Sequence, residues 1–289
     1  MTLRVRRGAL LGLVLALALV GGTLTLLWRP GYGDDAGRAP RRSSRLGEAA
    51  RTAVRLVPGL ERPGPAGLAA PRTLGAPRAG AQAGDGDGRL DIPLADPPPS
   101  RLPADGVPSG WQVQQFAGQA AMELIRTEIG LTLRLRSAQS SFALYRGVVV
   151  DLETLPVLAW AWKVVRQPAG GDARRRDADD QAAQVYVVFP RWPAPRASSD
   201  VLGYVWDTTV PVGTGLTSAK APNVRLIVVD SGSEGLGSWR YHQRNIRADY
   251  VALFGREPPR VGSVAVMIDS DDTGSAAEAL VGALAFSPF

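Results

Sequence analysis

The sequence predicts an all-β sandwich with one short helix, preceded by a transmembrane helix and a disordered linker. Three observations predict this arrangement. Short apolar segments recur between turn residues from Trp111 onward, where six of the seven tryptophans also lie. Helical periodicity with matching end residues is convincing only at Ile246–Phe254. Ahead of these segments stand a long uncharged apolar run and a stretch rich in proline and glycine.

The apolar run covers residues 8–28 and follows Arg4, Arg6 and Arg7. As a helix, its 21 residues would extend about 31 Å, enough to cross the hydrocarbon layer of a membrane. The leading arginines favour a cytoplasmic N-terminus, so the rest of the chain should lie outside the cytoplasm. We therefore expect an uncleaved signal anchor within residues 1–30. The alternative is secretion after signal cleavage near residues 16–18.

Residues 31–104 are expected to form a disordered linker. Residues 31–100 contain 10 Pro and 12 Gly, and Tyr32 is the only aromatic residue among them. Such a composition offers too little apolar surface to offset the conformational entropy lost on ordering. The sandwich domain should therefore occupy residues 105–289.

The charged residues are distributed unevenly along the chain. Residues 1–100 contain 14 Arg and Lys against 8 Asp and Glu, whereas residues 101–289 contain 19 of each sign. A neutral folded part without a basic stripe lacks the charge pattern of nucleic-acid binding, so we expect no nucleic acid among the partners. The chain has no cysteine, which excludes disulfides, iron–sulfur clusters, thiolate zinc sites and a cysteine nucleophile.

Ten segments have the apolar and β-branched character of strands. In residues 131–136, leucines alternate with polar residues, so one face should pack inside and the other should meet water. The segment 261–269 is apolar on both faces and should lie inside the fold. Many short strands without intervening helices predict a β-sandwich. The expected strands are 111–116, 131–137, 141–144, 148–152, 157–165, 184–189, 202–206, 224–230, 261–269 and 280–286.

The expected helix, Ile246–Phe254, has suitable residues at both ends. Asn245 can cap its N-terminus, Asp249 lies in the first turn, where a negative charge is favoured, and Gly255 can end it. Arg244, Asn245 and Asp249 are also candidates to line a polar ligand site. The alternative is that they only cap the helix and form an ion pair.

The strand at 261–269 leads directly into Asp269, Asp271 and Asp272, which form the strongest candidate for a site. Hard cations bind carboxylate oxygens, so these aspartates could hold Ca²⁺. The alternative is an Asp-rich turn whose side chains accept hydrogen bonds from backbone NH groups. Like charges this close repel unless a cation or NH donors offset them, so either arrangement should tie the loop to the sandwich.

Two further candidates are single residues. Trp192 lies in a proline-rich loop, where an exposed ring could stack on a sugar or cover an edge of the sandwich. His242 is the only histidine, and no nucleophile motif accompanies it, so we expect it to face solvent or to accept a structural hydrogen bond. We assign no catalytic residue.

Several motifs follow one another in a specific order: 158–163 (LAWAWK), 177–180 (DADD), 183–189 (AQVYVVF), 202–206 (LGYVW), 244–250 (RNIRADY), 254–255 (FG) and 264–274 (VAVMIDSDDTG). With them the chain resembles, over about residues 108–289, the bacterial family called domain of unknown function 3047. The pattern of strands, with an Asp-rich loop before the last one, is also similar to the galactose-binding-like jelly rolls of carbohydrate-binding modules. That similarity implies a jelly-roll-like β-sandwich. Asp272 departs from the family pattern, where Asn is expected, and makes this loop more acidic.

These features predict a bacterial inner-membrane protein with a single pass, held to the membrane by its N-terminal helix. Its extracytoplasmic domain is expected to be a non-catalytic binding module for a saccharide or another cell-envelope ligand. The sequence has no nucleophile motif, histidine cluster or phosphate-binding loop, which argues against an enzyme. The alternative is a glycan-acting hydrolase that uses paired carboxylates, which would need two carboxyl groups roughly 5 to 9 Å apart in a cleft.

Overall fold

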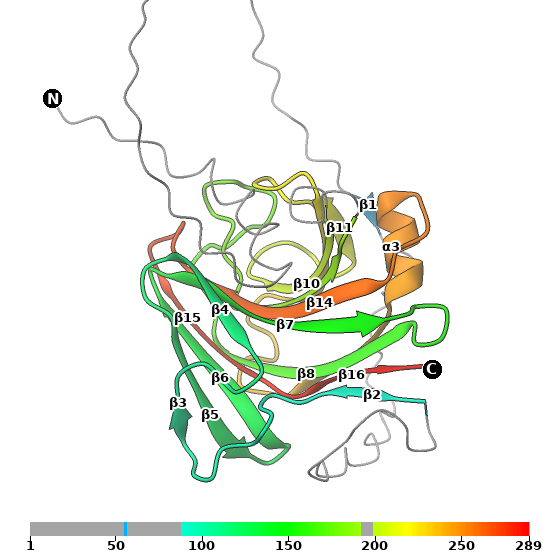
Figure 1. Cartoon of the computed structure of the whole chain (residues 1–289). Coiled ribbons are helices and arrows are strands. Elements are labelled where there is room, and N and C mark those ends of the chain that lie inside the picture. Colours follow the sequence, from blue (N-terminus) through cyan, green and yellow to red (C-terminus); the bar gives the residue numbers. More distant parts are fainter. Residues whose placement is uncertain (1–54, 57–87, 192–198, 289) are drawn as a thin grey trace, which may run out of the picture.

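The computed structural model describes residues 55, 56, 88–191 and 199–288. The anchor expected at 8–28, most of the linker and Trp192 lie outside the described residues. Among the described residues, no helix is long and apolar enough to cross a membrane. The described part is a sandwich of two β-sheets with one short helix, which confirms that part of the predicted fold class (Figure 1).

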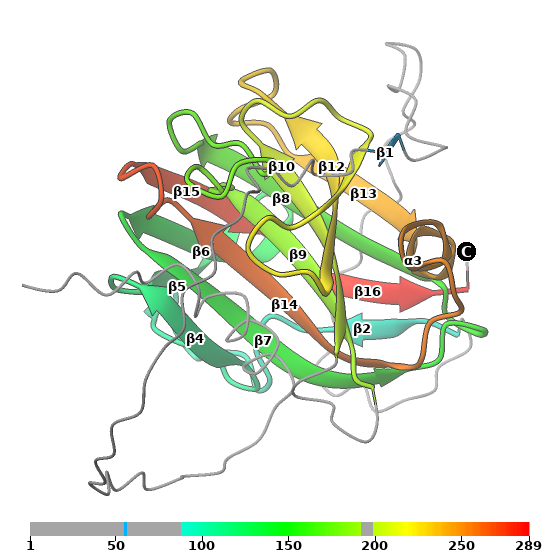
Figure 2. The ribbon, with the colours of Figure 1, turned by 90° about the horizontal axis from the view of Figure 1, so that it is seen from above.

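Figures 1 and 2 show how the two sheets face each other. We call them sheet A, in the order β1-β11-β12-β10-β9-β14-β7-β4, and sheet B, in the order β2-β16-β8-β15-β6-β5-β3 with β13 paired to β8. The strands of sheet A are β1 (Arg55–Leu56), β4 (Gln112–Ala117), β7 (Ser141–Val150), β9 (Ala183–Phe189), β10 (Asp200–Asp207), β11 (Thr214–Thr217), β12 (Val224–Ser231) and β14 (Val261–Asp269). Those of sheet B are β2 (Leu90–Ile92), β3 (Ala104–Asp105), β5 (Ala121–Thr127), β6 (Gly130–Ala138), β8 (Val157–Arg166), β13 (Arg240–Asn245), β15 (Ala276–Val281) and β16 (Leu284–Ser287). The helix is α3 (Ile246–Phe254).

Strand pairing is antiparallel throughout the described sheets except between β10 and β12, which run parallel. Antiparallel neighbours can be joined by a tight turn, but parallel neighbours need a longer connection. The connection between β10 and β12 contains β11, which pairs antiparallel with β12. Residues of this connection also cover part of the outer face of sheet A.

The central strands of sheet A are buried on both of their faces. Alternate side chains of β9, such as Val185 and Val187, pack between the sheets against Trp160 of β8. The intervening side chains, such as Tyr186, pack outward under loops that contribute buried Ala173, Val210 and Ala221 to a second core. Every residue of β9 and β10 and nearly every residue of β14 is therefore buried, as predicted for 261–269.

The structure joins or divides some expected strands. The segments 141–144 and 148–152 belong to one continuous strand, β7, which runs through Gly147, where its partner β14 has an irregular register. The expected last strand, 280–286, is two strands, because the chain leaves β6 after Val281 and pairs with β2 from Leu284. Cross-strand partners, which are remote in sequence, decided both outcomes.

Three strands lie where none was expected within the domain. β5 contains Met122, Glu123 and Leu124, which have higher helix than strand propensity, and β13 is almost entirely polar. Tertiary pairing with β6 and β8 overrides these local preferences. β11 has four residues. In addition, β2 pairs with β16, so the sandwich begins before residue 105, where the sequence analysis placed its start.

Candidate functional site

A small pocket opens on the outer face of sheet A, with about 40 Å³ of space for water-sized molecules. We call it the acidic pocket. Side chains from three stretches of the chain line it, within residues 179–186, 218–226 and 267–269. The polar lining is Asp179 and Gln181 before β9, Gln184 and Tyr186 on β9, Ser218 and Lys220 after β11, and Asp269 at the end of β14; the apolar lining is Ala221, Val224, Leu226 and Met267.

The pairing of β14 with β9 assembles the pocket, because it places the acidic end of β14 beside the segment that enters β9. The backbone NH of Asp269 donates to the carbonyl oxygen of Gln181 at 3.1 Å. Gln181 donates from Nε2 to Oδ1 of Asp179 at 2.9 Å. Tyr186 donates its hydroxyl to Oε1 of Gln184. These contacts fix the polar side chains before any ligand arrives.

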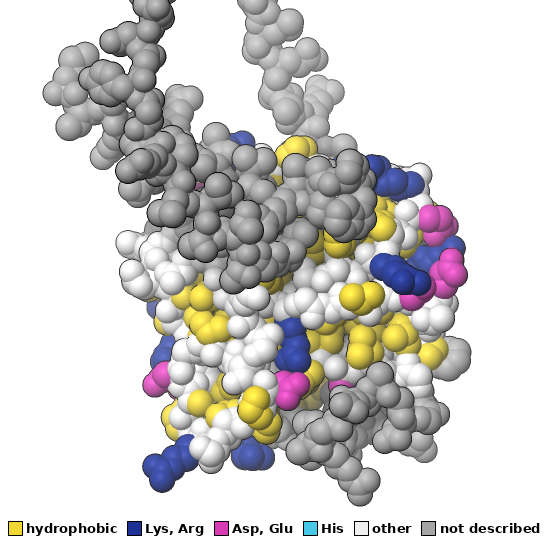
Figure 3. All heavy atoms as spheres, in the orientation of Figure 1, with side chains coloured by type: hydrophobic (Ala, Val, Ile, Leu, Met, Phe, Trp, Pro, Cys, Tyr) yellow, Lys and Arg dark blue, Asp and Glu magenta, His cyan; other side chains and the backbone are white. Residues whose placement is uncertain are grey.

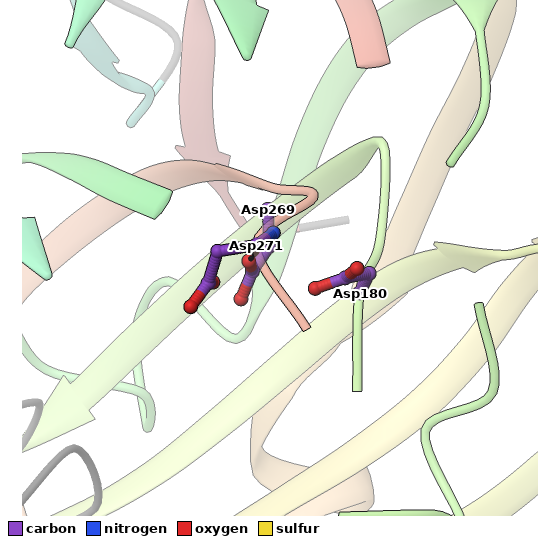
Figure 4. Close-up of side chains that lie close together, drawn as sticks. All are labelled: Asp180, Asp269 and Asp271. Atoms are coloured by element: carbon purple, nitrogen blue, oxygen red, sulfur yellow. Dashed lines mark hydrogen bonds between the residues drawn. The ribbon is translucent and has the colours of Figure 1, made fainter. Parts of the chain in front are cut away.

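A group of three carboxylates lies beside the pocket (Figure 4). One oxygen of each of Asp180, Asp269 and Asp271 lies within 4.8 Å of the others, close enough for the three to hold one cation. Asp180 is fully buried and accepts hydrogen bonds from the backbone NH groups of Asp272 and Thr273, at 3.2 and 2.7 Å. The hydroxyl of Thr273 also donates to it, at 2.5 Å. Asp180 thereby fastens the loop after β14 to the segment before β9.

A lysine from another loop supplies positive charge to the same region. Lys220 forms an ion pair with Asp272, and its side chain is only 10% exposed. Burial alone would lower the pKa of Lys220, but Asp269, Asp179 and Asp272 together raise it above its ordinary value. Lys220 is therefore a charged ammonium group among carboxylates at neutral pH.

The carboxyl groups themselves are costly to ionise. Burial raises the pKa of Asp179 to about 6, although Lys220 opposes the shift. Burial also raises the pKa of Asp269 well above its ordinary value, and the hydrogen bond with Asp271 adds to this shift. The pKa values of Asp272 and Asp207 are raised by burial as well. Perturbed carboxyl groups around a pocket are typical of functional sites, although structural networks also produce them.

The structure changes the expected set of metal ligands. The sequence analysis grouped Asp269, Asp271 and Asp272, but the carboxylates that converge are those of Asp180, Asp269 and Asp271, while Asp272 pairs with Lys220. Asp180 precedes β9 and Lys220 follows β11, so neither lies near the loop in sequence. The only signal for Asp180 was its place in the motif at 177–180. Gln184 and Tyr186 likewise lie in the motif at 183–189, whereas nothing in the sequence pointed to Lys220, Gln181 or Ser218.

The candidate ligand residues around α3 do not line the acidic pocket. Asn245 caps the helix by accepting a hydrogen bond from the NH of Ala248 at 2.9 Å, and Gly255 ends it with φ of 71°. Arg244 pairs with Asp249 through two hydrogen bonds of 2.9 and 2.5 Å. The structure thus confirms the predicted helix and both of its caps. Arg244, Asn245 and Asp249 cap the helix and form an ion pair, which was the alternative to their lining a ligand site.

His242 faces the space between the sheets. Its Nε2 lies 2.7 Å from Oδ2 of Asp230, which also accepts a hydrogen bond of 2.7 Å from the indole of Trp162. The imidazole ring stacks on Trp160 at 5.0 Å. The sequence analysis expected this histidine to face solvent or to make a structural hydrogen bond. In the structure it makes a structural hydrogen bond with Asp230.

The outer face of sheet B carries a different set of charges. Arg134 lies between Glu123 and Glu278, at 3.6 and 2.6 Å, and Arg136 lies 3.0 Å from Glu123. Tyr241 of β13 projects from this side of the sheet with 49% of its surface exposed. Arg134 therefore contacts both glutamates, and Arg136 also contacts Glu123.

The chain is similar to several solved structures, all at low sequence identity. A family 11 carbohydrate-binding module of a cellulosomal cellulase of Clostridium thermocellum is 8% identical, over 64% of this chain and 92% of that chain, with a TM-score of 0.34. Endoglucanase Cel12A from Rhodothermus marinus is 9% identical over 63% and 98%, with a TM-score of 0.38. The xyloglucanase domain of NopAA from Sinorhizobium fredii, solved with cellobiose, is 11% identical over 65% and 96%, with a TM-score of 0.36. Similarity at this level does not transfer a ligand or an activity.

No curated protein sequence matches the chain. A family match, in contrast, covers residues 109–285, which is more than half of the 289 residues. It includes every motif on which the resemblance rests, from 158–163 to 264–274. The chain therefore belongs to the family described as Protein of unknown function (DUF3047).

Proposed function

We propose that the sandwich is an extracytoplasmic domain that binds a saccharide through the acidic pocket. The observation that carries this proposal is the chemistry of the lining. Asp179 and Asp269 offer acceptors, Lys220 offers donors, and Gln184 offers both, while the rest of the lining is apolar. A sugar presents hydroxyl groups that donate and accept, together with apolar CH groups, and this lining complements both.

The size of the pocket limits what can enter. Its space of about 40 Å³ holds one or a few water-sized groups, whereas pockets that enclose a whole small molecule measure roughly 300 to 1,000 Å³. A single substituent of a sugar ring fits, and the ring itself would lie across the opening. The pocket is therefore suited to recognising one residue of a larger glycan, such as a cell-envelope polymer.

A glycan array with the full chain in detergent, with and without Ca²⁺, tests the proposal. We expect a defined set of glycans to bind, and we expect Gln184→Leu to weaken binding at least roughly tenfold because it removes a donor and an acceptor of the pocket. Gln243→Leu is the matched control, since Gln243 is an exposed glutamine on β13 of the other sheet. The proposal is wrong if no glycan binds or if both variants bind like the parent.

A glycan-acting hydrolase is the second candidate, and the pair of Glu123 and Glu278 is the observation that favours it. One carboxyl group of such a pair must carry a proton in order to act as the acid. Here Arg134 contacts both glutamates, and Arg136 contacts Glu123. The carboxylate oxygens that would have to reach a substrate are thus engaged by arginines, so we rank binding above hydrolysis. If the protein releases reducing ends from the glycans that it binds, hydrolysis would rank above binding.

The membrane anchor remains a proposal that rests on residues 8–28 and the arginines before them. An uncleaved anchor keeps the protein in the membrane fraction after washing with alkaline carbonate, with the native N-terminus intact. A mature N-terminus near residues 16–18, found by mass spectrometry of the soluble extracytoplasmic fraction, would replace this proposal with secretion.

A further inference from the structure

Three arginines meet at the end of sheet A where α3 packs. Arg191 follows β9 by two residues, Arg225 is the second residue of β12, and Arg256 follows the helix. We call these three side chains the arginine cluster. Asp200, the first residue of β10, lies among them. Figure 3 shows that charged side chains gather on the surface around α3.

Asp200 does not balance the cluster. Its Oδ2 lies 2.5 Å from Nη2 of Arg256 and accepts the hydroxyl of Tyr250 at 2.5 Å, while its Oδ1 lies 3.8 Å from Nη1 of Arg191. Among these four side chains, one carboxylate faces three guanidinium groups. The side chains of Arg191 and Arg256 are each 45% exposed, so an ion can reach them from solvent.

The fold holds two of the arginines against the same ring. The Cζ atom of Arg225 lies 5.1 Å from the centre of the Phe254 ring, and that of Arg256 lies 5.9 Å from it. Burial lowers the pKa of Arg225, Asp200 opposes this, and the nearby Arg256 lowers it again. Within residues 88–191 and 199–288, Arg225 forms no ion pair with a carboxylate. Its Nη1 donates to the carbonyl oxygens of Pro222 and Val224, at 2.6 and 3.4 Å, which engages one of its three nitrogens. Two like charges are thus kept close together although they repel.

We propose that the arginine cluster binds an oxyanion, which is a phosphate group or the carboxylate of an acidic sugar. Guanidinium groups present planar pairs of donors that match both kinds of oxyanion. An anion between Arg225 and Arg256 offsets their repulsion and uses donors that Asp200 does not occupy. The arginine cluster is separate from the acidic pocket, whose carboxylates repel anions. The proposal for the arginine cluster is therefore independent of saccharide binding in the acidic pocket.

Thermal unfolding of the full chain in detergent tests the site, with inorganic phosphate and glucuronate as probes and chloride at equal ionic strength as the reference. At about ten times the dissociation constant, each oxyanion should raise the melting temperature by about 2 to 4 °C, with saturation, and glucose should not. Arg225→Gln should abolish the shift. Arg247→Gln is the matched control, because Arg247 lies on α3, is 48% exposed and pairs with Glu257, and it should keep the shift.

Two outcomes overturn the proposal: phosphate and glucuronate act no differently from chloride, or Arg225→Gln responds like the parent. If Arg225→Gln does not fold, Arg225→Lys is used instead, because lysine keeps the charge but lacks the planar pair of donors. Arg225→Lys should lose at least half of the rise in melting temperature. A full rise in that variant would contradict the proposal. Gln184→Leu must retain the shift. Loss of the shift in that variant would place the anion in the acidic pocket beside Lys220 instead.

Discussion

The two outer faces of the sandwich carry the same kinds of charged residue under opposite conditions. On sheet A, loops cover the strands, and Asp179, Asp180 and Asp269 are almost completely buried. On sheet B no such second core covers the described strands, and the side chains of Arg134 and Arg136 are 34% and 48% exposed. The first face concentrates carboxylates around one lysine, whereas the second distributes arginines and glutamates in pairs.

This difference shows that burial, more than the number of charges, decides what a carboxylate does. Water screens an exposed ion pair, so such a pair contributes little to stability. Removing a carboxylate from water penalises its charged form, which is why the pKa of Asp179 rises to about 6 even with Lys220 nearby. The covered face is therefore where protonation, and any ligand that offsets charge, should matter.

The largest effect is expected from removing the buried cation. Lys220→Met leaves Asp272 without its ion-pair partner and Asp269 and Asp179 without a compensating charge, which should lower the free energy of unfolding by about 3 to 5 kcal/mol. Urea unfolding followed by tryptophan fluorescence measures this loss.

Lys163→Met is the matched control on the open face, since Lys163 pairs with Glu128, whose side chain is 61% exposed. It should cause a much smaller loss, because solvent screens that pair. Equal losses in the two lysine variants would remove the distinction between the covered and open faces.

The next effect concerns pH. In the folded state the pKa of Asp179 is raised from 3.8 to about 6, so the folded protein binds a proton there more tightly than the unfolded chain. The resulting stability is present below about pH 4 and is lost as the pH rises through about 6. Asp179→Asn should remove this loss and raise the free energy of unfolding at pH 7 by about 1 to 3 kcal/mol relative to the parent.

The measurement is urea unfolding of both proteins at a series of pH values from 4 to 8. Other buried carboxyls contribute to the pH dependence of both proteins, so the informative quantity is the difference between the two curves. That difference should grow between about pH 4 and 6 and then stay level. A constant difference across the whole range would mean that Asp179 titrates normally in the folded protein.

The smallest effect is expected from chelation. Lys220 offsets Asp272, and backbone NH groups together with Thr273 offset Asp180, so EDTA should change the melting temperature of the parent by less than about 1 °C. A drop on chelation that Ca²⁺ reverses, and that is absent when Asp269, Asp271 and Asp272 are all changed to Asn, would instead assign a Ca²⁺ ion to the carboxylate group.

The sequence was sufficient wherever structure depends on neighbouring residues. Alternation along 131–136 and the doubly apolar run at 261–269 identified β6 and β14, because a strand shows its burial in a period of two residues. Asn245 and Gly255 marked the ends of α3, because a cap acts on NH and carbonyl groups within one turn of itself. The acidic end of β14 was also evident, since its three aspartates lie within four residues.

Tertiary structure decided everything that depends on which distant segments meet. β13 is a strand because β8 pairs with it, although its polar side chains give no local reason for it. Asp180 replaces Asp272 in the carboxylate group, and Lys220 supplies the compensating charge, because the β9–β14 pairing and the loops over sheet A bring together residues that are far apart in the chain. By itself the sequence determined elements such as β6, β14 and α3 and the presence of charge. Burial and cross-strand pairing determined the remaining strands, which charges meet, and the free-energy cost of burying each charge.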